Sequence, residues 1–333
     1  MTLLFEQTLN GVTLGGLYAL IALGYTLVYG ILLMINFAHS ELFMAGGYVG
    51  LFVLKILSDP AMAGHVDLAF IKADLTFMKP LQDFFNGSTF GFAMLMVATF
   101  VISAIMVGLL GMLTERLAYR PLRNAPRLAP LISAIGVSIF LQNAALLWIS
   151  TKQLPYSRAD GTAFVPSQNL FTFGGVTVTS MQVFIIVTSL LLLLFLDTFV
   201  SRTRIGKAMR ATSQDREAAG LMGIDINSVI ALAFFIGPAL GAVAGVFNGM
   251  YYGSVKYNMG FIPGIKAFTA AVIGGIGNLR GAMLGGFLLG IVESLAGGFI
   301  SEGYKDVIAF IVLILVLIFR PGGLLGEAVA EKV

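Results

Sequence analysis

Nine long stretches of this chain are almost purely apolar, and they leave few choices of fold. They cover 11–35, 40–57, 91–114, 130–150, 180–200, 228–251, 264–278, 281–299 and 305–320. A run of about 20 apolar residues crosses a bilayer as a helix, because lipid offers no hydrogen-bond partner to an open backbone group. The runs are continuous and do not alternate with polar residues, which favours helices over a β-barrel. We therefore predict an all-α, polytopic membrane protein with about eight to ten transmembrane helices.

The composition agrees with a membrane protein. Of the 333 residues, 58% are hydrophobic and 11% are charged, whereas soluble domains have about 25% charged residues. The chain has no cysteine, which excludes disulfides and thiol chemistry. The net charge of +3 is concentrated in loops. We interpret it as an orientation signal toward the membrane lipid and not as affinity for nucleic acid. The N-terminus has no basic residue before its first apolar run, so we expect no cleaved signal peptide.

The loops differ in charge, and this difference predicts their side of the membrane. Arginine and lysine are concentrated in the loops 115–129 and 201–227, with Arg320 and Lys332 near the C-terminus. Such basic segments are cytoplasmic in membrane proteins. The loops 58–90 and 151–179 mix basic residues with aspartates, so we place them outside. Counting crossings back from the loop 201–227 places the N-terminus outside, and the count depends on whether residues 264–299 cross twice.

The chain divides into two halves around the loop 201–227. We treat 1–333 as one integral membrane domain, with halves 1–200 and 228–333. In each half a glycine-rich, interrupted segment follows the first apolar run, at 35–50 and at 264–281. Two halves of opposite topology with interrupted helices are a known transporter plan, and the breaks usually lie near the transport path.

These breaks supply the candidate residues of the path. They are Asn36, His39, Gly46, Gly47, Gly274 and Gly275. Two structural alternatives stay open. The glycine pairs can simply allow tight helix packing. Asn36 can end one helix, and Ser40 can cap the start of the next at a membrane interface.

Glycine also recurs at intervals of four, at positions 237, 241, 245 and 249, and in the pairs 281/285 and 286/290. In a membrane helix this spacing puts small residues on one face, so that another helix backbone can come close. The sequence leaves open whether that helix belongs to this chain or to a second subunit.

The chain is poorly supplied for catalysis. Its only histidines are His39 and His65, and it contains neither an HExxH zinc motif nor a GxSxG nucleophile elbow. Gly206-Lys207 lacks the upstream glycine of a phosphate-binding loop. We therefore predict no enzyme activity, no metal and no bound cofactor, so any ATP must be held by another subunit.

Few ionisable residues lie inside the predicted spans. Glu293 is one, and intramembrane charge is usually functional. The scarcity of buried carboxylates weakens an ion-coupled carrier as an alternative without removing it. Lys256 and Lys266 flank the start of an apolar run, and we expect both at the outer interface with their charged ends in water.

The loop 201–227 is too long and too rich in helix formers for a plain turn. Its centre, Arg210 to Ala219, reads RATSQDREAA, and it contains Glu217-Ala218-Ala219 with Gly223 four residues later. A short helix with small residues can bind in a cleft of a partner protein. Charged residues at the edge of such a contact then fix the position of the helix in the cleft. The alternative is a solvated cytoplasmic loop.

The segment EAAGLMG at 217–223 resembles the coupling motif of ABC importer permeases, although the usual Ile-x-Leu-Pro ending is shifted here. Other stretches are similar to the high-affinity branched-chain amino acid permease family. They are NGVTLGGLYALIALGYTLVYGILLMINFAHSELFMAGGY (10–48), ERLAYRPLRNAPRLAPLISAIGVSIFLQN (115–143), GIKAFTAAVIGGIGNLRGAMLGG (264–286) and YKDVIAFIVLILVLIFRPGGLLG (304–326). The outer loops 58–90 and 151–179 carry the least resemblance.

The resemblance implies a subunit of an ATP-driven importer in the bacterial inner membrane. Its implied partners are a second, related permease, two cytoplasmic ATPases, and a periplasmic or extracellular protein that delivers leucine, isoleucine or valine. The implied ATPase-coupling residues are Arg210, Asp215, Arg216, Glu217, Ala218, Ala219 and Gly223. Urea, short amides and other amino acids remain open as substrates, because permeases for them look much alike.

Overall fold

The computed structural model describes residues 2–59, 65–68, 71–74, 78–123, 125–126, 128–165, 167–173 and 175–326. Its α-helices are α1 (Thr2–Leu32), α2 (His39–Ser58), α3 (Lys79–Gly87), α4 (Thr89–Thr114), α5 (Leu128–Trp148), α6 (Ser180–Arg202), α7 (Arg204–Gln214), α8 (Arg216–Leu221), α9 (Ile226–Tyr252), α10 (Phe261–Gly274), α11 (Leu279–Phe299) and α12 (Lys305–Phe319). A π-helical turn (Glu115–Tyr119) and a 3₁₀ turn (Arg120–Leu122) extend α4.

Short strands occur only in the connections of the described chain. They are β1 (His65–Leu68), β2 (Ile71–Asp74), β3 (Leu154–Pro155), β4 (Asn169–Phe173), β5 (Val176–Thr179) and β6 (Ser254–Val255). They form three antiparallel pairs, β1–β2, β3–β6 and β4–β5. The all-α prediction is confirmed.

Each of the nine predicted spans corresponds to one helix. Seven helices of the described chain are long and apolar enough to cross a membrane. The other two, α10 with 14 residues and α12 with 15, are shorter. At 1.5 Å per residue they extend over about 21–23 Å, less than the hydrocarbon thickness of about 30 Å. The chain is therefore a multi-pass membrane protein in which two helices do not span the bilayer alone.

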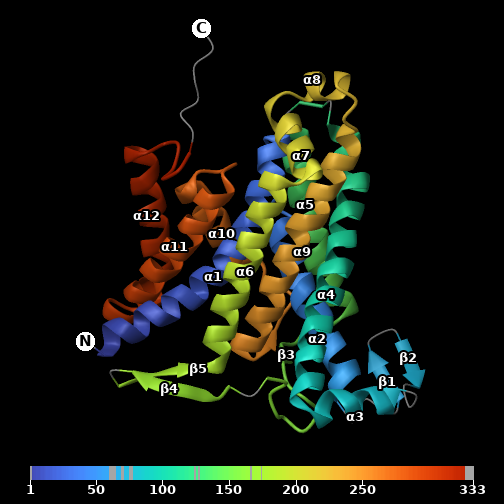
Figure 1. The fold of residues 1–333 in the computed structure, drawn as a ribbon, viewed down its shortest axis with the longest axis vertical. Helices are drawn as coiled ribbons and strands as arrows, with labels where there is room; N and C mark the ends of the chain where they lie inside the picture. Colours follow the sequence, from blue (N-terminus) through green and yellow to red (C-terminus); the bar gives the residue numbers. More distant parts are fainter. Residues whose placement is uncertain are drawn as a thin grey trace.

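The helices stand side by side, and the connections gather at two ends (Figure 1). The helices α7 and α8 lie at one end, where the Arg123 side chain donates a hydrogen bond to Asn227 at 2.7 Å. The loops 115–129 and 201–227, both predicted to be cytoplasmic, therefore meet at one end. The labelled hairpins and α3 lie at the other end, on the side where the N-terminus is marked. Residues 60–64, 69–70 and 75–77 of the predicted outer loop, and Lys332, lie outside the described residues.

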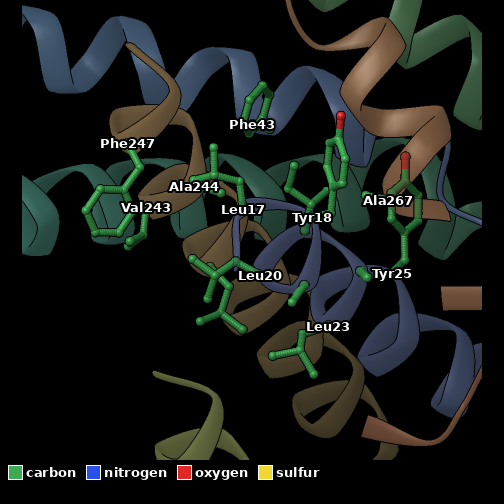
Figure 2. Close-up of a cluster of buried hydrophobic side chains, with 14 of the residues drawn as sticks. Leu17, Tyr18, Leu20, Leu23, Tyr25, Phe43, Val243, Ala244, Phe247 and Ala267 are labelled. Carbon is green, nitrogen blue, oxygen red and sulfur yellow. The ribbon is translucent and has the colours of Figure 1, made fainter. Parts of the chain in front are cut away.

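The helix α1 forms the centre of the core (Figure 2). Leu17, Leu20 and Leu23 of α1 are at most 2% exposed. They belong to a cluster that includes Phe43 of α2 and Phe247 of α9. From Gly11 to Val28 almost every residue of α1 is buried, and this part of the helix packs against α9, α10 and α11.

The glycine ladder of α9 packs against helices of the same chain. A Cβ atom at Gly245 would overlap the carbonyl oxygen of Phe43 in α2, and Gly237 lies against the backbone of Gly24 in α1. A side chain at Gly249 would meet the ring of Tyr156. The sequence left open whether the partner of these glycines belongs to this chain or to a second subunit. For α9, the partner belongs to this chain.

The two glycine pairs of α11 face two different helices. A Cβ at Gly285 would overlap the carbonyl oxygen of Ala270 in α10, whereas a Cβ at Gly290 would overlap the backbone of Gly15 in α1. Close backbone approach on two sides holds α11 between α1 and α10.

The first interrupted segment differs in detail from the prediction. The helix α1 ends at Leu32 and α2 begins at His39, so Asn36 lies within the connection and does not end a helix. Asn36 is buried, and its side chain accepts a hydrogen bond from the backbone N–H of Ala38 at 3.1 Å. The interpretation of Asn36 as an interfacial helix end was therefore wrong, because the loop folds inward and satisfies its own backbone.

The two interrupted segments meet inside the bundle. A Cβ at Gly264, in the first turn of α10, would overlap the side chain of Ser40 in the first turn of α2. Gly260, just before α10, lies equally close to the Ser40 carbonyl. The starts of α2 and α10 are therefore neighbours, although an inverted relation between the two halves stays a prediction.

We predict that Gly290→Val destabilises the fold by about 3 kcal/mol, the upper end for overpacking, because the atoms it meets are backbone. The apparent melting temperature of the purified protein in detergent measures this loss. Gly136→Val in α5 is the matched control, since no atom lies within 4 Å of the new Cβ. Equal melting temperatures for the two variants would contradict the packing argument.

We also predict the sidedness of the two ends. The chain contains no cysteine, so a single introduced thiol reports its own position. A membrane-impermeant maleimide added outside intact cells should label Thr177→Cys, on the exposed edge of β5, and should not label Ser213→Cys in α7 before lysis. The reverse pattern would invert the assignment of the two ends.

Candidate functional site

A cavity of about 580 Å³ lies inside the bundle, beside the paired strands β3 and β6. Its volume falls within the range of about 300–1,000 Å³ that is typical of small-molecule sites. Leu14, Leu17 and Ile21 of α1 and Phe43 of α2 form an apolar part of its wall. The rest of its lining is mostly polar and comes from α9 to α12 and their connections, together with Tyr18 of α1 and Gln153 just before β3.

Charged side chains from three helices converge on this cavity. Nζ of Lys266 in α10 lies 2.6 Å from Oε1 of Glu293 in α11 and 2.6 Å from Oδ1 of Asp306 in α12. The Lys266 and Glu293 side chains are each 4% exposed, whereas that of Asp306 is 43% exposed. Tyr18 of α1 donates its hydroxyl to Oε2 of Glu293 at 2.8 Å. We call Tyr18, Lys266, Glu293 and Asp306 the charged cluster.

The charged cluster is costly to build in a membrane, because both buried charges have lost their water. Their attraction offsets that cost only where geometry is good and the remaining lone pairs are satisfied. Here both Glu293 oxygens have partners, and Lys266 Nζ lies 5.9 Å from the centre of the Tyr18 ring, within cation–π range. An arrangement of this cost inside a membrane is a functional candidate by default.

The sequence predicted one of the four residues of this cluster. Glu293 was expected inside its span, and it is buried. The expectation that Lys266 lies at the outer interface was wrong, because Lys266 is 3% exposed and pairs inside the bundle. Lys256 is exposed, as expected of a residue at the interface. The signal for the pair was two opposite charges in neighbouring apolar runs, but their spacing alone did not show that they meet.

The residues proposed to line the path from the sequence lie around the helix breaks and not in the cavity wall. A Cβ at Gly46 would overlap Ala242 of α9, and one at Gly274 would overlap the carbonyl of Gly281. Gly47 lies against Met259, and Gly275 lies against Gly326 with a φ of 106°. Close packing accounts for all four glycines, and a role in the path stays a prediction.

Asn36 and His39 lie at the inward fold between α1 and α2. The hydroxyl of Tyr119, in the π-helical turn, donates to Oδ1 of Asn36 at 2.6 Å. The ring of His39 is fully buried and packs edge-on against Tyr25, with 4.7 Å between ring centres. Whether substrate passes these two residues also stays a prediction.

The proposed ATPase-coupling residues lie on α7, α8 and the turn after α8. The Asp215 side chain caps α8 by accepting from the N–H of Ala218 at 3.0 Å. Ala219 is buried, and Gly223 has a φ of 84°, a left-handed conformation that suits glycine after a helix. Glu217, Ala218 and Gly223 are exposed.

Two apolar residues at the tip of this segment were missed by the sequence reasoning. Leu221 is 89% exposed and Met222 is 83% exposed. They stand between Ala219 and Gly223, and so inside the motif itself. Exposed apolar side chains on a polar segment mark a contact surface for a partner when they are contiguous.

Three arginines tie this segment to the membrane helices. Arg216 donates to the carbonyl of Ile31, in the last turn of α1, at 2.8 Å. Arg210 donates to the carbonyl of Val200 at the end of α6. Arg123 pairs with Glu115 in the π-helical turn and also bonds to Asn227 at the start of α9. Arg216 thus connects α8 to α1, Arg210 connects α7 to α6, and Arg123 connects the turn after α4 to the start of α9.

The start of α9 is fixed by its own cap. Asp225 accepts from the N–H of Asn227 at 3.0 Å and from the hydroxyl of Ser228 at 2.5 Å. The hydrogen bond from the Ser228 hydroxyl is the main cause that lowers the pKa of Asp225, so the carboxylate stays ionised near neutral pH. The Asp225 side chain thus fixes where α9 begins.

Permease proteins of transport systems are similar to this chain. The family described as "Branched-chain amino acid transport system / permease component" matches residues 7–317. The high-affinity branched-chain amino acid transport system permease protein BraD of Pseudomonas aeruginosa is 45% identical, over 98% of this chain and 97% of its own length. The corresponding LivH proteins of Salmonella typhimurium and Escherichia coli are each 43% identical over the same shares. No solved structure matches the chain.

We predict that Lys266→Ala destabilises the protein by about 3–5 kcal/mol, because it leaves the buried charge of Glu293 without a counter-charge. The double variant Lys266→Met, Glu293→Gln removes both charges at similar volume, so its loss should be much smaller. Apparent melting temperatures in detergent compare the two. If the double variant melts as low as the single one, packing and not charge holds the charged cluster together.

Proposed function

Because this chain belongs to the family of branched-chain amino acid transport system permeases, we propose that it forms part of the path by which leucine, isoleucine and valine enter a bacterial cell. The observation that carries the proposal is the match over 98% of the chain to permeases of that transport system at 43–45% identity. The family consists of membrane permeases and not of enzymes. The energy for transport is therefore supplied elsewhere.

The proposed assembly has four kinds of subunit. A second, related permease completes the path, and two cytoplasmic ATPases bind and hydrolyse ATP. A periplasmic or extracellular binding protein delivers the amino acid to the outer end of the bundle. The chain itself lacks a phosphate-binding loop, which is consistent with ATP being bound by the partners in the inner membrane complex.

The segment α7–α8 is the proposed docking surface for an ATPase. Glu217, Ala218, Leu221, Met222 and Gly223 are exposed on it. A partner that grips this tip pulls on Arg216 and thereby on the last turn of α1. When the ATPases close on ATP, the docked segment moves with them, and the packed helices switch between outward and inward access as rigid bodies.

We predict that Leu221→Asp, Met222→Asp detaches the ATPase, because two charges would replace the apolar tip of the contact. The affinity-tagged permease complex is purified, and the amount of ATPase subunit retained on it is measured. The matched control is Leu170→Asp, Phe171→Asp in β4, which changes two exposed apolar neighbours at the opposite end. The docking surface would be refuted if the Leu221→Asp, Met222→Asp variant kept its ATPase, whether or not the control lost it.

A second measurement separates this importer from an ion-coupled carrier. Leucine uptake into vesicles should require both ATPase subunits and ATP inside. It should vanish when Glu217→Ala and Gly223→Ala are combined. Uptake that persists without ATPases would support the carrier instead.

A further inference from the structure

The cavity beside β3 and β6 combines a charged part with an apolar part, as an α-amino acid does. Five residues with charged side chains line it: Lys256, Lys266, Glu293, Lys305 and Asp306. Charge is therefore available for both an ammonium and a carboxylate group. The apolar wall of α1 and α2 adjoins these charges within one cavity.

The charges inside the cluster are not balanced. The ammonium group of Lys266 forms ion pairs with two carboxylates, those of Glu293 and Asp306. Glu293 is fully engaged by Lys266 and Tyr18. Asp306 is the carboxylate with an exposed side chain, at 43%. A cationic group entering the cavity would therefore find its counter-charge at Asp306.

The positive charge needed for a carboxylate also lines the cavity. Lys256 is exposed, whereas the Lys305 side chain is 37% exposed and pairs with Glu302 at 2.7 Å. Lys256 is therefore the main source of positive charge for a carboxylate. Ile262 and Pro263, in the first turn of α10, line the same space. The positive end of the α10 helix dipole therefore adds to the lysines there.

We propose that this cavity is a binding station for the transported α-amino acid within the permease. Asp306 accepts its ammonium group, Lys256 pairs with its carboxylate, and the apolar wall of α1 and α2 holds its side chain. This proposal rests on the proposed function. It goes further by placing a binding site for the amino acid on the permease itself. Lys266 and Glu293 are positioning residues, which hold Asp306 and the starts of α10 and α12 around the cavity.

A purely structural role for the cluster makes a different prediction. An ion pair that only joins helices needs no exposed second carboxylate and no adjoining cavity. Such a pair would be indifferent to what enters the space beside it. Ligand protection of the cavity wall therefore distinguishes the two roles.

The test uses a single cysteine in the cavity wall of the otherwise cysteine-free chain. Asn258→Cys is reconstituted in the full complex in proteoliposomes, and its rate of alkylation by a membrane-impermeant maleimide is measured. Leucine should slow alkylation several-fold, whereas 4-methylpentanoate, which lacks the ammonium group, should not. Ser301→Cys, exposed outside the cavity wall, is the matched control and should react equally with and without leucine.

The variant Asp306→Asn tests whether Asp306 binds the ammonium group of the amino acid. Because its side chain is half-exposed and Asn has the same shape, the fold should be retained, and an unchanged melting temperature checks this. Leucine should no longer protect Asn258→Cys in this background, and ATP-driven leucine uptake should fall several-fold. Persistent protection, or protection by 4-methylpentanoate equal to that by leucine, would overturn the assignment.

Failure of the station and failure of the proposed function give different results. Uptake of leucine by the unmodified complex with its binding protein is measured in the same vesicles. If leucine is imported but never protects Asn258→Cys, even near its solubility limit, the station is refuted and the importer stands. If no branched-chain amino acid is imported at all, the proposed function itself fails.

Discussion

The structure depends on the close approach of helix backbones at glycines. Lipid tails are as apolar as leucine, so burial of leucine gives little drive for helices to associate within a membrane. Contact between backbones must supply it. Gly245 against Phe43, Gly237 against Gly24, and Gly290 against Gly15 bring α9 and α11 onto α2 and α1. The enclosed position of α1 in Figure 2 follows from these contacts.

The enclosed helix α1 links the two candidate regions. Tyr18 bonds to Glu293 in the charged cluster, and the Ile31 carbonyl accepts from Arg216 of α8, which belongs to the proposed docking segment. These residues are 13 positions apart, which corresponds to about 20 Å along a helix. Because a packed helix moves as a unit, a displacement of α1 at Ile31 also displaces Tyr18. The helix α1 thus joins the proposed docking segment to the cavity.

The sequence allowed the helices to be predicted well and the polar contacts poorly. Long apolar runs determine where helices lie, and the four-residue glycine spacing indicated the close contacts of α9 and α11. Lys266 and Glu293 are 27 residues apart, and no local pattern encodes that they meet. Leu221 and Met222 look like ordinary apolar residues until the fold leaves them exposed. Contacts that depend on three-dimensional arrangement were thus beyond the reach of sequence periodicity.

The position of the cavity indicates where the bundle can change shape. Glycine contacts join α2 to α9, and others join α11 to both α1 and α10. Such contacts resist sliding, because displaced backbones collide. The cavity is lined from both sets, by Phe43 and Asn248 on one side of this division and by Tyr18, Lys266 and Glu293 on the other. Glycine contacts also cross this division, because Gly237 of α9 lies against Gly24 of α1 and Gly264 of α10 lies against Ser40 of α2. A rotation of one set against the other would therefore alter the cavity and these two contacts together. Rigid groups that meet at a polar cavity provide the physical basis for alternating access.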